Sequence, residues 1–152
     1  MNRISVFWGA FLGAFVGLAF AGDVTVRDAW TRATVPGQKV AGVYFEIQSS
    51  TDARLVGVQT DLTDAAEIHL MRMQDGVMRM RAVSAVDLPA GKTVNFKPGG
   101  YHVMLFDLPR QLQAGEQFPL ELVVEDANRQ RSEVAVTVQV RNLNGSKVHP
   151  HH

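Results

Sequence analysis

The sequence of 152 residues contains no cysteine. No thiolate is therefore available to bind a metal, and an electron-transfer blue-copper site, which requires a cysteine ligand, is excluded. An excess of one charge is also absent, because 15 basic and 15 acidic residues cancel. This balance gives no reason to expect nucleic acid or an anionic membrane surface as a partner. A nucleophile-elbow motif is missing as well, and we do not expect an enzyme.

A long uncharged apolar run occupies the N-terminus, over residues 4–20, directly after Arg3. It ends in the small-x-small sequence Ala19-Phe20-Ala21, which is typical of a secretory signal peptide. We expect cleavage after Ala21, removal of residues 1–21, and a periplasmic protein with no membrane attachment. The alternative is an uncleaved anchor, because a G-x-x-x-G series in this run is typical of helix packing in membranes. That series consists of Gly9, Gly13 and Gly17.

The rest of the chain alternates between short β-prone segments and turn residues, with no convincing long helix. We expect strands at residues 24–30, 40–48, 54–60, 65–73, 77–83, 93–97, 101–107, 117–125 and 133–140. Apolar residues at every second position are clearest in the last two segments. Such evenly spaced strands favour an all-β fold, a Greek-key β-sandwich. It forms one domain over residues 22–141, followed by a flexible tail over residues 142–152.

Methionine and histidine are concentrated in one part of the chain. Apart from the start residue, every methionine lies within residues 71–104, and His69 and His102 bracket most of them. The spacing from His69 through Met80 and His102 to Met104 reads H-x10-M-x21-H-x-M. Thioether sulfur suits soft Cu(I) and is a poor ligand for Zn²⁺, Mg²⁺ or Ca²⁺. The cluster is therefore core packing or a copper site, and packing alone gives no reason for two histidines to accompany the methionines.

The turn Asp75-Gly76 predicts how the first half of this cluster is arranged. A two-residue type I′ hairpin turn there pairs residue 73 with 78 and residue 71 with 80. Because side chains alternate between faces, His69 and the hairpin methionines project from the same side. These methionines are Met71, Met73, Met78 and Met80. The other side carries Arg72 and Arg79 and is expected to be solvated.

A later strand carries the second half of the cluster. His102, Met104 and Phe106 share one of its faces, because they occupy alternate positions. A sandwich in which this face meets the methionine side of the hairpin gathers four ligands, namely His69, Met80, His102 and Met104. For Met71, Met73 and Met78 taken singly, packing or an exposed surface position remains an alternative to a role with copper.

Four segments carry a resemblance to a known family: EIHLM at 67–71, GVMRMR at 76–81, LPAG at 88–91 and KPGGYHVML at 97–105. They closely resemble the PCu(A)C-type periplasmic copper chaperones, whose signature has the same ligand spacing. The resemblance extends from Ala29-Trp30 to about Val140. It implies a cupredoxin-like β-sandwich that binds one Cu(I) and supplies the CuA centre of a haem-copper oxidase, often alongside a Sco-type protein. Position 70, often acidic in this family, is Leu here.

By this resemblance the copper ligands are His69, Met80, His102 and Met104, with copper as the only cofactor. A separate hypothesis, which rests on the chemistry of thioethers and not on the resemblance, is that Met71, Met73 and Met78 form a soft apolar rim where an acceptor docks or copper is handed over. Because histidine protonates near pH ~6.5, Cu(I) binding should weaken as the pH falls toward and below that value.

Other interpretations stay open. A periplasmic copper-storage or resistance protein would use the same ligands without a dedicated acceptor, and a purely structural or adhesive β-sandwich would bind no copper. The tail offers a second metal hypothesis, a Cu(II) site formed by His149, His151 and His152. An expression-tag remnant or an inert tail is its alternative.

Overall fold

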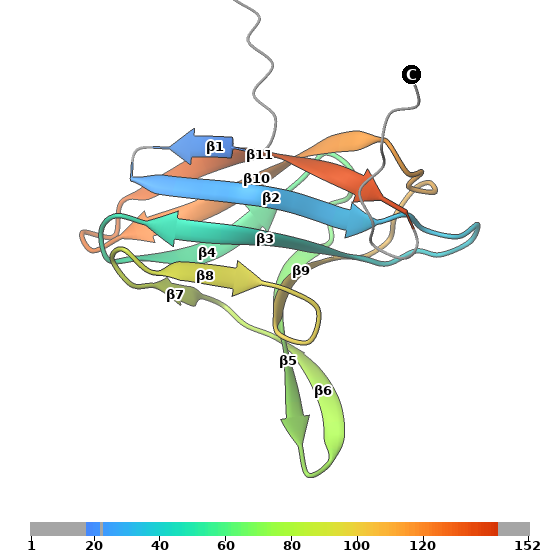
Figure 1. Cartoon of the computed structure of the whole chain (residues 1–152), viewed down its shortest axis with the longest axis horizontal. Helices are drawn as coiled ribbons and strands as arrows, with labels where there is room; N and C mark the ends of the chain where they lie inside the picture. Colours follow the sequence, from blue (N-terminus) through green and yellow to red (C-terminus); the bar gives the residue numbers. More distant parts are fainter. Residues whose placement is uncertain (1–17, 22, 143–152) are drawn as a thin grey trace, which may run out of the picture.

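The computed structural model describes residues 18–21 and 23–142, and these residues form eleven strands (Figure 1). The strands are β1 (Leu18–Ala21), β2 (Val24–Arg32), β3 (Ala41–Ser49), β4 (Ala53–Gln59), β5 (Ala66–Gln74), β6 (Val77–Ala82), β7 (Val86–Leu88), β8 (Thr93–Phe96), β9 (Tyr101–Leu105), β10 (Gln117–Asp126) and β11 (Arg131–Arg141). The described part of the chain contains no helix with the length and apolarity needed to cross a membrane. The predicted all-β class is confirmed.

All nine predicted strands are present, with ends that differ from the prediction by at most two residues. The prediction missed β7, whose three residues are too few to show an alternating pattern. It also missed β1, which belongs to the segment interpreted as a signal peptide and pairs with β2, with Ala21 opposite Val24. The other predictions for the two chain ends concern residues that the structure does not describe. These are the glycines of the possible anchor, Gly9, Gly13 and Gly17, and the tail histidines His149, His151 and His152.

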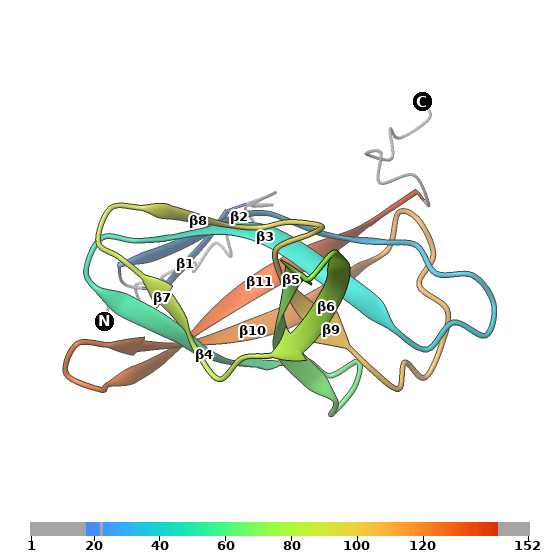
Figure 2. The ribbon, with the colours of Figure 1, turned by 90° about the horizontal axis from the view of Figure 1, so that it is seen from below.

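The strands form one hydrogen-bonded path that curls back on itself. Its order is β6-β5-β9-β8-β3-β2-β11-β10-β4-β7, and β1 adds to β2. The view in Figure 2 shows β2, β3 and β8 on one side of the interior and β4 and β10 on the other. The two layers of the expected sandwich are therefore the two halves of a single curled sheet.

The interior is built from the alternating apolar positions of these strands. In β3 the buried residues include Val43, Phe45 and Ile47, and Phe45 stacks on Phe96 of β8 at a ring-centroid distance of 4.4 Å. The two C-terminal strands bury the apolar faces that their sequence predicted. The residues are Phe118, Leu120, Leu122, Val124, Val134, Val136, Val138 and Val140.

A β-bulge in β2 changes which side of that strand faces the interior. Val26 is buried before the bulge and Ala29 after it, because Asp28 occupies an extra position with φ of 54°. The register with β3 shifts at the same place. Trp30 consequently lies on the outer face of the sheet, where its ring meets that of Tyr44 at 4.9 Å.

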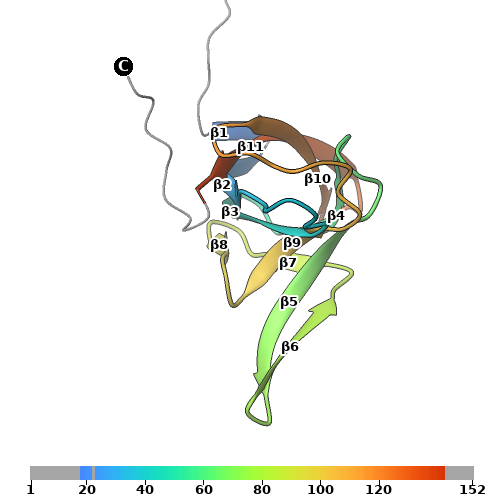
Figure 3. The ribbon, with the colours of Figure 1, turned by 90° about the vertical axis from the view of Figure 1, so that its right-hand side faces the viewer.

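The β5–β6 hairpin extends away from the body of the protein (Figure 3). The first residues of β5 pair with β9, whereas β6 pairs only with β5 and every residue of β6 is exposed. This hairpin and β9 carry the clustered histidines and methionines.

Candidate metal centre

The two histidines are neighbours on adjacent strands. In the antiparallel pairing of β5 with β9, His69 lies directly opposite His102, and Ile68 lies opposite Val103. Ile68 and Val103 face the core, so both histidines lie on the outer face of the sheet, although each is buried. We had predicted two opposed surfaces meeting across a sandwich. The structure instead places the two halves of the cluster side by side on one sheet face, because β5 pairs with β9.

The predicted register of the hairpin is confirmed. Met73 lies opposite Met78, Met71 opposite Met80, and Asp75 has the positive φ of a type I′ turn. The Met71–Met80 pair is therefore two pairs along the ladder from the pair of His69 with Ala82, so Met80 is on the same face as His69. Every methionine of the hairpin shares that face with the histidine pair.

Met104 reaches this face from β9. It lies two residues beyond His102 and is paired with Glu67 of β5 and with Gly42 of β3. The four residues singled out from the sequence thus occupy one face of three adjacent strands, β6, β5 and β9.

His102 has an environment that suits a ligand of a soft cation. Its Nδ1 is 3.2 Å from the carbonyl oxygen of Gly100, and its Nε2 is 3.0 Å from the sulfur of Met80. Because a carbonyl can only accept, the neutral ring donates from Nδ1 and keeps its lone pair on Nε2. Two lone-pair donors, nitrogen and sulfur, therefore face each other, an arrangement that a Cu(I) ion would stabilise.

The protonation of His102 favours the same role. Burial lowers its pKa, and the nearby His69 lowers it further, while the hydrogen bond to Gly100 acts in the opposite direction. The ring therefore stays neutral at a lower pH than an ordinary histidine. Protonation of His102 should therefore weaken copper binding only at a pH below ~6.5, the value for an ordinary histidine.

His69 presents an unpaired nitrogen. Its Nε2 lies 2.7 Å from a carboxylate oxygen of Glu67, whereas its buried Nδ1 has no hydrogen-bond partner. Nε2–H donates this hydrogen bond to the carboxylate of Glu67, so the lone pair of the neutral ring is on Nδ1. A buried imidazole nitrogen without a partner is costly, and a metal ion would satisfy it. The ring of Phe106 packs 5.6 Å from that of His69.

Glu67 was not identified from the sequence as part of the site. Strand alternation would have placed it there, because it is two residues before His69 on the same face of β5. Its exposed carboxylate orients the imidazole and adds negative charge next to a site whose other donors are neutral.

Replacing Glu67 by Gln should weaken Cu(I) binding by about tenfold, within the range found when a group that orients a metal-bound histidine is lost. The amide keeps the shape of the side chain and removes its charge. Competition with a chromophoric Cu(I) chelator under anaerobic conditions measures the change. Glu46→Gln, an exposed carboxylate on β3, is the matched control and should leave the affinity unchanged. Equal affinities for the Glu67→Gln variant and the wild type would contradict a supporting role for Glu67.

The methionines of the hairpin are not core residues. Met73, Met78 and Met80 are 66%, 47% and 41% exposed, so packing does not account for them. Met71 and Met104 are partly buried. Exposed methionine side chains therefore lie beside a buried histidine pair.

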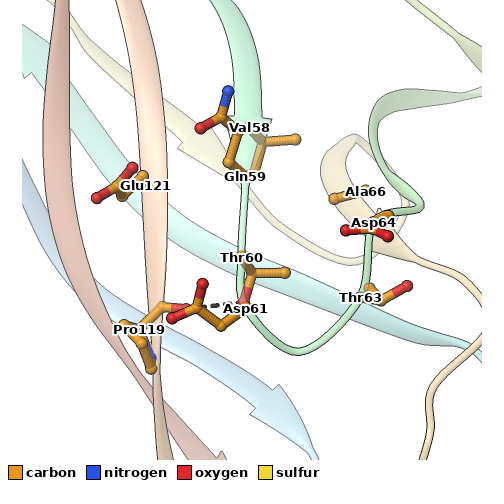
Figure 4. A pocket seen from close by; sticks show the side chains of 9 residues that line it. All are labelled: Val58, Gln59, Thr60, Asp61, Thr63, Asp64, Ala66, Pro119 and Glu121. Carbon is orange, nitrogen blue, oxygen red and sulfur yellow. Dashed lines mark hydrogen bonds between the residues drawn. The ribbon is translucent and has the colours of Figure 1, made fainter.

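Oxygen donors do not form a competing site. Within the described residues, no group of three or more His, Cys, Asp or Glu side chains is placed to hold a metal ion. A hollow bordered by the end of β4, the loop that follows it and β10 does collect Asp61, Asp64 and Glu121 (Figure 4). Beside it Thr60 donates a hydrogen bond to the carbonyl of Pro119. This hollow contains neither histidine nor methionine and does not suit Cu(I).

Residues 24–140 match the family model described as LpqE-like, putative lipoprotein. A putative lipoprotein of Leifsonia xyli subsp. xyli is 30% identical over 127 residues, which cover 83% of this chain and 74% of that protein.

The chain is also similar to solved structures. The copper-bound PCuAC domain from PmoF2 is 25% identical, with a TM-score of 0.65 over 82% of this chain and 97% of that domain. The Cu(I) form of DR1885 from Deinococcus radiodurans is 26% identical, with a TM-score of 0.51 over 74% of each chain. The fold shared with these domains is cupredoxin-like, as predicted.

Proposed function

The chain belongs to the LpqE-like family, which corresponds to the PCuAC domains, and from this premise we propose that it is an exported copper chaperone. In this proposal one Cu(I) is bound by His69, Met80, His102 and Met104. The observation that carries it is the 3.0 Å contact between the free nitrogen of His102 and the sulfur of Met80, next to the unpaired Nδ1 of His69. Copper is the cargo, and carrying it requires no catalytic step.

The donor set suits a carrier. Neutral imidazole and thioether hold Cu(I) without a thiolate, so an acceptor that offers cysteine can withdraw the ion. Met80, which is 41% exposed, gives such an acceptor a point of approach. A structural or adhesive β-sandwich would need neither the buried histidine pair nor the exposed methionine.

The location we propose is the periplasm, after removal of residues 1–21, with residues 22–141 as the copper-binding domain. Relatives are described as putative lipoproteins, which agrees with export. The present chain contains no cysteine, so none of its side chains can carry a thioether-linked lipid. The tail histidines 149, 151 and 152 remain a separate Cu(II) hypothesis.

The acceptor we propose is the apo CuA domain of a haem-copper oxidase, with a Sco-type protein as a second participant. Mixing the Cu(I)-loaded protein with an apo CuA domain should transfer the ion, as followed by loss of copper from the donor on a separating column. Retention of copper at equilibrium, with a normal affinity for Cu(I), would favour the alternative of a storage or resistance protein.

The rim methionines provide a further test. Replacing Met71, Met73 and Met78 by Leu removes sulfur and keeps apolar volume. We expect slower transfer to the CuA domain and an almost unchanged one-to-one Cu(I) affinity, because these residues lie outside the proposed ligand set. Stopped-flow transfer kinetics and chelator competition measure the two quantities. A large loss of affinity would show that a rim methionine is a ligand.

A further inference from the structure

Three arginines share the face of the β5–β6 hairpin that lies opposite its methionines. Arg72 pairs directly with Arg79, and Arg81 is two residues further along β6, opposite Leu70. All three arginines are exposed, and none forms an ion pair with another described residue. Like charges directly opposite each other destabilise a strand pair. The stability of the hairpin therefore does not account for this arrangement.

The arginine face is accessible to a partner of protein size. The hairpin stands clear of the curled sheet (Figures 1 and 3). A hollow of about 540 Å³ is bordered by the three arginines together with Leu70, Met73, Gln74 and Met80. Met80 is among the residues that border the hollow, so a group bound there lies beside the strand that carries the proposed copper ligand.

The charge is local. The whole chain is neutral, and in the hairpin beyond His69 the only acidic residue is Asp75, at the turn. Guanidinium groups bind carboxylates in a planar, two-pronged geometry, and clusters of arginine are a recurrent means of recognising acidic segments. A positive surface next to a transfer site also increases the rate at which an oppositely charged partner arrives.

We infer that Arg72, Arg79 and Arg81 form a docking surface for an acidic protein surface, that of the partner that receives the copper. This inference rests on the proposed chaperone function. It adds that the acceptor presents carboxylates beside its own copper site, so that charge pairing brings that site to the free edge of β6, the strand that carries both Met80 and two of the arginines.

Protection of an edge strand is the competing explanation. Charged residues on exposed edges such as β6 prevent edge-to-edge aggregation. That role depends on charge of either sign and predicts no effect on a partner. An anionic lipid surface is the other ligand with suitable charge.

The test compares Cu(I) transfer rates for the wild type and the variant Arg72→Gln/Arg79→Gln/Arg81→Gln, with an apo CuA domain as the probe. At low ionic strength the second-order rate should fall by about tenfold or more, because electrostatic steering is lost. Added salt should slow the wild type and have little effect on the variant. The affinity for Cu(I) should not change, and the melting temperature should stay the same or rise, since the like-charge pair is removed.

The matched control is Arg27→Gln/Lys39→Gln/Lys92→Gln, which removes the same charge from exposed positions elsewhere. It should transfer copper like the wild type. Equal slowing of both variants, or of neither, would overturn the docking surface. Aggregation of the arginine variant with an unchanged transfer rate would establish edge protection instead.

A second probe separates this inference from the proposed function. If the wild type does not transfer copper to the CuA domain, the proposed acceptor fails, and poly-L-glutamate then tests the arginine face alone. Amide shifts confined to residues 70–81, absent in the arginine variant and present in the control, would support an acidic protein ligand. No shifts, or binding only to phosphatidylglycerol vesicles, would overturn it.

Discussion

Replacing His102 by Ala is expected to weaken Cu(I) binding by on the order of a hundredfold or more, since even the groups that only orient a ligand contribute 10–100-fold to metal affinity. The variant loses the Nε2 that faces the sulfur of Met80 at 3.0 Å. Met80 then has no nitrogen opposite it, and the buried Nδ1 of His69 is left with fewer donors around a shared ion. Chelator competition on the mature protein, without oxygen, measures the loss.

The same experiment needs a control on the same sheet face. Met78→Ala removes an exposed methionine from β6 without touching the proposed ligand set and should leave the affinity unchanged. Met104→Ala should resemble His102→Ala. The melting temperature of the apo proteins shows whether each variant is folded. If His102→Ala binds copper as tightly as the wild type while folded, the ligand set proposed above is wrong.

Replacing Phe45 by Ala is expected to lower the free energy of unfolding by about 3–5 kcal/mol, the usual cost of removing a large aromatic side chain from a core. Phe45 is 2% exposed and stacks on Phe96 between β3 and β8. Its loss leaves a cavity lined by residues from strands far apart in the sequence, which cannot easily close. Denaturant unfolding followed by circular dichroism gives the difference.

An exposed apolar residue provides the comparison. Val35 is 47% exposed on the loop between β2 and β3, and Val35→Ala should change the free energy of unfolding by no more than about 0.5 kcal/mol. If the two substitutions had similar effects, Phe45 would not be part of the stabilising core.

The sequence was most informative where structure is local. The Asp75-Gly76 turn fixes which hairpin residues lie opposite each other, because only residues that tolerate positive φ form a type I′ turn. Strand alternation then placed the methionines and His69 on one side. In β10 and β11 the same alternation identified the buried positions.

Features that depend on distant residues were not predictable in the same way. Nothing within residues 65–73 or 101–107 specifies that β5 and β9 pair. The sequence therefore predicted that His69 and His102 meet across two layers of a sandwich, whereas they lie opposite each other on adjacent strands. No turn motif in the sequence marks the bulge at Asp28. This bulge nevertheless places Trp30 on the outer face of the sheet. The hydrogen bonds that distinguish the two nitrogens of each imidazole depend on Gly100 and Glu67 in the folded state.

The position of β6 at the end of the strand order has a consequence for how the ion leaves. Two of the proposed ligands lie on β9, which is bonded to neighbours along both edges, and one lies on a strand that is bonded along a single edge and is exposed throughout. Local opening is easiest in such terminal strands. Detachment of residues 77–82 would remove one sulfur from the ion while the two imidazoles stay in place, so the cargo can be released stepwise without disturbing the interior. Amide hydrogen exchange should accordingly be faster in β6 than in β9.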